Sequence, residues 1–382
     1  MMNTASTLRP SRREMAQAMR EFATPHTATG VRLFAVDLAL FLAGMAVALF
    51  TAHPLLRAAG AVLAGARING LYTLAHDAGH GVLTTSKRLN RLLALLGYLP
   101  ALYNHRLWHY DHQVFHHVKT NGPQIDVWRP MSLAAYRAAA WYRRAWERFV
   151  RAFNPLGFAL YIAYHSRVEQ HKFMPRKAFH PAGVRAAAWP TTLVLLAYLG
   201  ALLGWMAWRN AGLAGFALDV GFGLVLPFFV FMNAVAMGAY LQHTHPDVPW
   251  FLESDEAKSG YDQAALAVDF RMPGWLDTLA HEALAHPAHH VLPAIPCYRL
   301  REAQNRLASM LGSQSIESRG ADLLSIYRRC KLYDFENRRW LDFAGNPTTL
   351  TVPLPGAGYR LQGASARAAP ALHAHPPARP AA

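Results

Sequence analysis

Histidine is the residue type whose number and spacing point most directly to chemistry in this chain. The sequence has 20 histidines among 382 residues, and most stand in short clusters that read HDAGH, HRLWHYDHQVFHH, QHTHP and HEALAHPAHH. Imidazole nitrogens suit iron, copper and zinc. A structural zinc site needs only four ligands, so a set of this size predicts two metal ions and redox chemistry.

The spacing within the first two clusters places pairs of rings on common helical faces. His76 and His80 are four residues apart, and so are His112 and His116, so each pair shares one face of a helix and can converge on a metal. His117 is rotated by about 100° from His116 and is available to a second metal nearby.

The last cluster, HEALAHPAHH, repeats a paired HH with a histidine three residues before it, at His286, His289 and His290. Its beginning resembles a zinc-peptidase motif, but that motif needs two histidines four residues apart on one helical face. His281 and His286 are five apart, so we reject the peptidase interpretation.

Four other histidines of these clusters lie outside the groups of rings described above. His105 and His109 extend the stripe of the second cluster, where a polar stripe or hydrogen bonding behind the ligands explains them at least as well as metal binding. His243 and His245 stand in QHTHP, close after a long apolar stretch.

The elements that position these clusters are membrane helices. Hydrophobic residues make up 53% of the chain and charged residues only 16%, a poor match to a soluble protein. The net charge of +15 suits nucleic acid or the anionic cytoplasmic leaflet, and the apolar content favours the leaflet over nucleic acid. Two cysteines, Cys297 and Cys330, are too few for a thiolate metal site or a disulfide framework.

Four apolar stretches have about the length that a helix needs to cross the hydrocarbon core. Arg57 and Arg67 make the second stretch the weakest, and we expect Arg57 to reach the interface and Arg67 to face the bundle or water. Short connections pair the stretches into two hairpins. The predicted spans are 31–52, 55–75, 186–208 and 220–242.

This topology places every histidine cluster on one side of the membrane. The segment between the hairpins is rich in arginine, so the positive-inside rule makes that side cytoplasmic. We therefore predict an all-α integral membrane protein with a cytoplasmic helical cap that carries a histidine-ligated di-iron site. Leu89 to Tyr103 and Leu156 to Tyr164 are shorter apolar stretches, expected in the interface or beneath the site.

The chain then divides into three parts. Residues 1–30 form a cytoplasmic segment in which Ser11 and Glu14 have capping-box spacing, residues 31–352 form the membrane domain, and the tail 353–382, rich in Ala, Pro and Gly, is expected to be disordered.

With these motifs in order, the sequence resembles the membrane fatty acid desaturases, and within them the Δ12-type acyl-lipid desaturases. That family carries histidine boxes HxxxH, Hxx(x)HH and HxxHH, matched by HDAGH, HQVFHH and HPAHH, and a separate histidine matched by His243. Thr120 and Asp126 stand at the family's offsets, and HVLPAIPCY follows the third box as its Pro-Tyr segment does. The resemblance spans roughly Val31 to Arg301.

The resemblance implies a set of metal ligands. The second box has three residues between His112 and His116 where many relatives have two, so His109 remains an alternative to His112, as His245 does to His243. Asp77, Asp111 and Asp126 are candidates to orient imidazoles. The implied ligands are His76, His80, His112, His116, His117, His243, His286, His289 and His290.

The implied reaction is insertion of a double bond into a long acyl chain of an acyl lipid or acyl thioester. An alkyl C–H bond resists side-chain chemistry, so two iron ions with O2 as co-substrate are expected. No reductase motif is visible, so electrons must come from a ferredoxin or cytochrome b5 type donor. A di-iron lipid hydroxylase, ketolase or acetylenase is the first alternative, and a histidine-rich metal transporter is the second.

Overall fold

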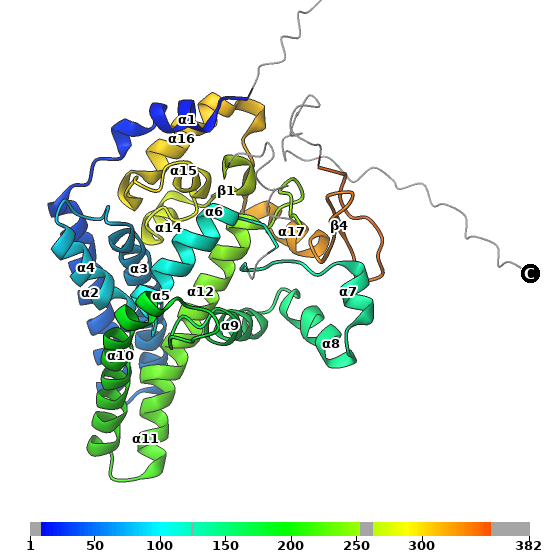
Figure 1. The fold of residues 1–382 in the computed structure, drawn as a ribbon. Helices are drawn as coiled ribbons and strands as arrows, with labels where there is room; N and C mark the ends of the chain where they lie inside the picture. The colour runs from blue at the N-terminus through cyan, green and yellow to red at the C-terminus, as the bar shows by residue number, and fades with distance from the viewer. Residues whose placement is uncertain (1–8, 124–125, 253–262, 353–382) are drawn as a thin grey trace, which may run out of the picture.

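The computed structural model describes residues 9–123, 126–252 and 263–352. Long helices run side by side at one end of the molecule, and shorter helices gather at the other end (Figure 1). Residues 1–8 of the predicted N-terminal segment and the predicted disordered tail, 353–382, lie outside the described residues.

Three helical rods of the described chain are long and apolar enough to cross a membrane. They are α2 (Thr27–Phe50), α10 (Ala182–Arg209) and a continuous rod, Leu213–His243, built from α11 (Leu213–Val220), the π turn η4 (Gly221–Val225) and α12 (Leu226–His243). The predicted connection 209–219 is therefore too long, because the third rod already begins at Leu213.

The second predicted span is helical but does not meet the same apolar criterion. It lies within α3 (Pro54–His80), a helix of 27 residues that packs against both α2 and α12. A side chain on Gly60 would come within 2.7 Å of the Gly44 carbonyl oxygen of α2. Small residues thus let α3 approach α2 closely, as expected where helices pack in lipid.

Both arginines of α3 have acidic partners on other helices. Arg67 Nη1 lies 2.8 Å from Asp37 Oδ1 in α2, with both side chains buried, which confirms that Arg67 faces the bundle. Arg57 Nη2 lies 2.7 Å from Asp219 Oδ1 near the opposite end of the bundle. The two ion pairs tie α3 to α2 and to α11, so the arginines need not face lipid.

The remaining helices form the cap. The cap also contains two small two-stranded sheets, so the prediction of a purely helical cap is wrong. The parallel pair joins β1 (Asp269–Arg271) to β2 (Glu317–Arg319), and the antiparallel pair joins β3 (Leu332–Asp334) to β4 (Arg339–Leu341). The cap helices are α1 (Arg12–Ala18), α4 (Lys87–Tyr98), α5 (His105–Asp111), α6 (His117–Lys119), α7 (Leu133–Ala138), α8 (Trp141–Val150), α9 (Pro155–Tyr164), α14 (Gly274–Leu279), α15 (His286–Val291), α16 (Leu300–Leu311) and α17 (Leu323–Arg329), with π turns η2 (His112–His116) and η3 (His165–Glu169) and 3₁₀ turns η1 (Arg20–Phe22), η5 (Gln263–Leu266), η6 (Cys297–Arg299), η7 (Gly312–Gln314) and η8 (Gly320–Asp322).

Two local predictions for the cap are confirmed. Ser11 and Glu14 form both hydrogen bonds of a capping box at the start of α1, and Cys297 and Cys330 are buried free thiols. Met15 of α1 and Leu307 of α16 belong to one buried cluster with Ala288 of α15, so the N-terminal helix packs over the helix that carries the third histidine box.

Candidate metal centre

The structure brings histidines from all the predicted boxes into two adjacent groups. Within each group, one ring nitrogen from each residue lies within 4.8 Å of the others. The first group joins α3, the second box and α15, and the second group adds the end of α12. The groups are His76, His80, His112 and His289, and His116, His243, His286 and His290.

His117 lies against the first group. Its Nε2 atom is 2.9 Å from His112 Nε2 and 3.1 Å from His289 Nε2. All nine predicted ligands therefore converge, although residues from 76 to 290 contribute them.

The second box reaches this arrangement through an irregular helix. Residues His112–His116 form a π turn between α5 and α6, and such turns insert one residue into an α-helix. The extra residue of the second box is absorbed here, so His112, and not His109, joins the first group. The prediction that His112 and His116 converge on one metal and His117 on another is wrong, because the π turn places His117 beside His112 and His116 in the second group.

Hydrogen bonds behind the rings orient several of them. His76 Nδ1 lies 3.0 Å from Asp77 Oδ1, His116 Nδ1 lies 3.3 Å from Asp126 Oδ1, and His243 Nδ1 lies 3.0 Å from the carbonyl oxygen of Leu266. An acceptor on Nδ1 places the proton there and leaves the Nε2 lone pair free for a metal.

Burial favours the neutral form of several ligands. Burial, and then the neighbouring imidazoles, hold the pKa of His112, His117, His289 and His290 well below the ordinary histidine value. Neutral imidazole is the form that binds metal. Two buried ring nitrogens, His80 Nε2 and His117 Nδ1, have no hydrogen-bond partner among the described residues. The donor set thus fits nitrogen-ligated transition metals.

Asp126 is held as a carboxylate behind His116. Its burial favours the neutral acid, but the adjacent His116 and backbone N–H donors outweigh burial and keep the pKa of Asp126 below its ordinary value. Its carboxylate also accepts hydrogen bonds from the backbone N–H groups of Asn121 and Val127. The loop after the second box is therefore fixed by the same carboxylate that orients the ligand.

Several other candidates lie outside the two groups. His105 Nδ1 lies 3.5 Å from Thr191 Oγ1, and His245 is buried with its Nδ1 accepting from the Asp247 backbone N–H. The expectation that Asp111 orients a ligand is wrong, because its closest ionic partner in the described structure is His180, at 4.0 Å.

Two residues at the centre escaped the sequence reasoning. Gln113 Nε2 lies 2.6 Å from His80 Nδ1, and the Trp108 ring stacks on His112 with centroids 4.3 Å apart. The only sequence signal that could have identified them is their position within the second histidine cluster, HRLWHYDHQVFHH. His281, just before the third box, instead lies 2.6 Å from Asp37 Oδ2 in α2.

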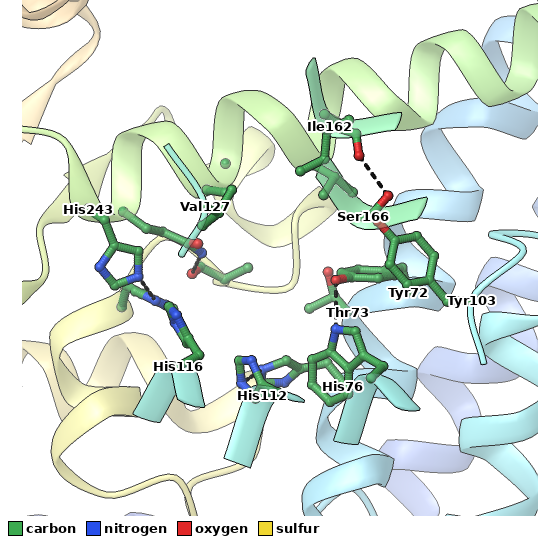
Figure 2. A pocket seen from close by; sticks show the side chains of 18 of the residues that line it. Tyr72, Thr73, His76, Tyr103, His112, His116, Val127, Ile162, Ser166 and His243 are labelled. Atoms are coloured by element: carbon green, nitrogen blue, oxygen red, sulfur yellow. Dashed lines mark hydrogen bonds between the residues drawn. The ribbon is translucent and has the colours of Figure 1, made fainter. Parts of the chain in front are cut away.

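A cavity of ≈ 680 Å³ opens onto both histidine groups. Figure 2 shows His76, His112, His116 and His243 on one side of it and Ile162 and Ser166 on another. Its wall is largely apolar and includes Val235, Ala239 and Leu241 of α12. Tyr103 is the one residue of the stretch Leu89 to Tyr103 in that wall.

Together, a helical bundle and paired histidine groups facing an apolar cavity define a membrane-associated metalloprotein. Residues 52–318 match the model of the fatty acid desaturase family, and the chain belongs to that family.

Several curated proteins are similar to this chain in sequence. The chain is 31% identical over 245 residues to an sn-1 acyl-lipid omega-3 desaturase (ferredoxin) of Synechocystis, covering 63% of this chain and 64% of the relative. It is 26% identical to a chloroplastic omega-6 fatty acid desaturase of Spinacia oleracea, covering 71% and 58%. It is 24% identical to an sn-1 oleoyl-lipid 12-desaturase of Picosynechococcus, covering 74% and 78%. The match to the first two spans about three fifths of the relatives' length.

Proposed function

We propose that this protein is an acyl-lipid desaturase that inserts a double bond into a long acyl chain, using O2 and electrons from a separate donor. The observation that carries the proposal is the pair of four-histidine groups facing one largely apolar cavity. An apolar cavity of this size suits a hydrocarbon chain, and the groups lie where such a chain would pass.

We assign the nine converging histidines as ligands of two iron ions. Bound iron would supply the activation of O2 that an unactivated C–H bond requires. The residues of this chain orient and shield the site: Asp77 and Asp126 fix two rings, and burial favours the neutral form of His112, His117, His289 and His290. Metal analysis of the purified protein should find two irons per chain, and one zinc without iron would contradict the assignment.

The wall of the cavity would hold the acyl chain in place. Val235 and Ala239 of α12 present an apolar surface, and Ile162 of α9 closes another side. Fixing the chain against this surface would decide which pair of methylenes lies near the metal groups. Relatives named as 12-desaturase and omega-3 desaturase favour a substrate that already carries a double bond.

A ferredoxin is the electron donor that the relatives' names favour. A cytochrome b5 type donor remains the alternative. Assays of the purified chain with reduced ferredoxin or with reduced cytochrome b5 would separate the two.

For the topology, we propose four spans in two hairpins, with α3 as the second span and the metal groups on the cytoplasmic side. The length of α3 and its two ion pairs with other helices support this proposal. Labelling of single cysteines should place Arg143 on the cytoplasmic side and His53 on the opposite side. Finding both on one side would exclude the two-hairpin topology.

Product analysis tests the reaction itself. Lipids from a host that expresses the protein with a compatible donor should gain one double bond in mid-chain, detected by mass spectrometry. Hydroxylated or ketone products without added unsaturation would replace the proposal with the hydroxylase or ketolase alternative. Metal uptake without any change in lipids would favour a transporter.

A further inference from the structure

A histidine and a glutamate form a pair in the cavity wall, apart from the metal groups. His165 and Glu169 belong to the π turn η3, which follows α9 directly. His165 Nδ1 lies 2.7 Å from Glu169 Oε2, and both residues line the cavity. Neither belongs to the two histidine groups.

The His165 ring is held in a fixed orientation. It stacks on Tyr161 with centroids 5.5 Å apart and an angle of 11° between the rings. Tyr161 stacks in turn on Trp128, at 3.8 Å. The His165 side chain is 2% exposed, so the ring has little freedom to turn toward solvent.

The other nitrogen of this ring lacks a partner. Nε2 of His165 is buried and has no hydrogen-bond partner within the described parts of the chain. Burying such an atom without a partner costs free energy, and because His165 lines the cavity, a ligand that reaches Nε2 would recover that cost. The hydrogen bond from His165 is the main reason that the pKa of Glu169 lies below its ordinary value, so the carboxylate persists and holds the ring.

The position of the pair indicates which part of a substrate would reach it. The link that follows η3 leads into α10, whose first residue is Ala182, and Lys172, Ala178 and Phe179 of that link line the same cavity. Because α10 is long and apolar enough to span the membrane, its first residues lie near the bilayer interface. A lipid headgroup lies at that depth, whereas its acyl tail lies deeper.

We infer that His165, held by Glu169, binds a hydroxyl group of the headgroup of a glycerolipid substrate. This inference rests on the proposed function. A hydroxyl both donates and accepts a hydrogen bond, so it fits Nε2 of a neutral or a protonated ring. An acyl tail offers no such group. The hydroxyl belongs to a glycerol or to a sugar headgroup, and the two sources are separated in the test.

The test is a binding competition that does not depend on turnover. The purified full chain in detergent is offered equal amounts of three dioleoyl lipids, and bound lipid is counted by native mass spectrometry. Phosphatidylglycerol carries hydroxyls and one negative charge, phosphatidylmethanol carries the charge without hydroxyls, and glucosyl-diacylglycerol carries hydroxyls without charge. We expect both hydroxylated lipids to exceed phosphatidylmethanol by roughly tenfold, the effect of one good hydrogen bond.

Variants then assign the effect to the ring. His165→Ala should bring the ratio of hydroxylated lipid to phosphatidylmethanol close to one, and His165→Gln, which keeps a polar end, should retain part of it. His53 is exposed in the link directly before α3. His53→Ala makes the same change there and should keep the full ratio. Thermal melting in the same detergent verifies that each variant is folded.

Three results would overturn the inference. They are equal binding of all three lipids by the unchanged protein, a preference that survives in His165→Ala, and equal binding of phosphatidylglycerol and phosphatidylmethanol above glucosyl-diacylglycerol, which would indicate recognition of charge. Desaturation of the same lipids is measured separately with reduced ferredoxin and with reduced cytochrome b5. A hydroxyl preference without any desaturated product would refute the proposed function and leave the headgroup site standing.

Discussion

The Nε2 atoms of His112 and His117 lie 2.9 Å apart, although residues five apart in a regular α-helix point about 140° away from each other. The π turn His112–His116 removes that angular difference. It brings His112 and His117 together and leaves His116 in the other group. One inserted residue thus lets a single short segment supply ligands to both groups.

Loss of a ligand should abolish activity without preventing membrane insertion. We expect no product and reduced bound iron in His80→Ala, His117→Ala or His290→Ala, because each ring nitrogen faces the metal groups and no described hydrophobic cluster includes them. His105→Ala should be milder, since its ring contacts Thr191 outside the groups. Iron content and lipid products measure both effects. Full activity of His290→Ala would refute the ligand assignment.

Gln113 should matter although it is not a ligand. Gln113→Ala removes the group 2.6 Å from His80 Nδ1, and loss of such a partner lowers metal affinity by about 10- to 100-fold. Iron retained against a chelator measures the change. Gln17→Ala, on an exposed face of α1, should retain iron as the unchanged protein does. Equal retention in both variants would show that the Gln113 contact has no role.

The metal-free protein should lose stability as the pH falls. Burial lowers the pKa of His286, His289 and His290 below the ordinary value near 6.5, so the unfolded chain binds protons that the folded chain does not. The stabilisation is therefore complete above about pH 6.5 and declines below it, by up to about 1.4 kcal/mol per pH unit for each such group. Melting temperatures of the metal-free protein at pH 7.5 and pH 5.5 test this. A higher melting temperature at pH 5.5 would contradict it.

The buried pair of Asp37 and Arg67 should show strong coupling. Asp37→Asn leaves the Arg67 charge without its carboxylate and should lower the free energy of unfolding by about 3–5 kcal/mol. It also weakens the contact of Asp37 with His281, which holds the loop before the third box. Replacing both Asp37 and Arg67 by leucine should cost less than the single change. Melting in detergent gives the comparison, and purely additive losses would rule out the coupling.

The close contact of α2 and α3 predicts a position-specific effect of one methyl group. Gly60→Ala would place Cβ 2.7 Å from the Gly44 carbonyl oxygen, and such overpacking costs about 1–3 kcal/mol. Gly200→Ala in α10 has no atom within 4 Å of the added Cβ and should be neutral or slightly stabilising. Melting temperatures distinguish them. Equal temperatures would argue against the tight packing.

The sequence alone pointed to a histidine-ligated metal site and to the family of this protein. The spacing of HDAGH and HPAHH predicted the pairs His76–His80 and His286–His290, which each stay in one group, and the apolar stretches predicted the long helices, because both patterns depend on local geometry along the chain. The same reasoning failed for HQVFHH, where the π turn separates His112 from His116. The family prediction is confirmed by the match over residues 52–318. The boundaries of α2 and α10 differ from the predicted spans by only a few residues.

Only the tertiary structure decided how the histidines divide between two groups. His76 and His289 join one group and His116 and His243 the other, which depends on how α3, α12 and α15 meet and on the π turn. The partners of the rings were likewise beyond sequence reasoning, since Asp37 contacts a residue 244 positions away and Asp111 lines the cavity without a hydrogen bond to a ligand ring. Contacts between distant segments depend on packing, and a pattern along one segment carries no record of what packs against it.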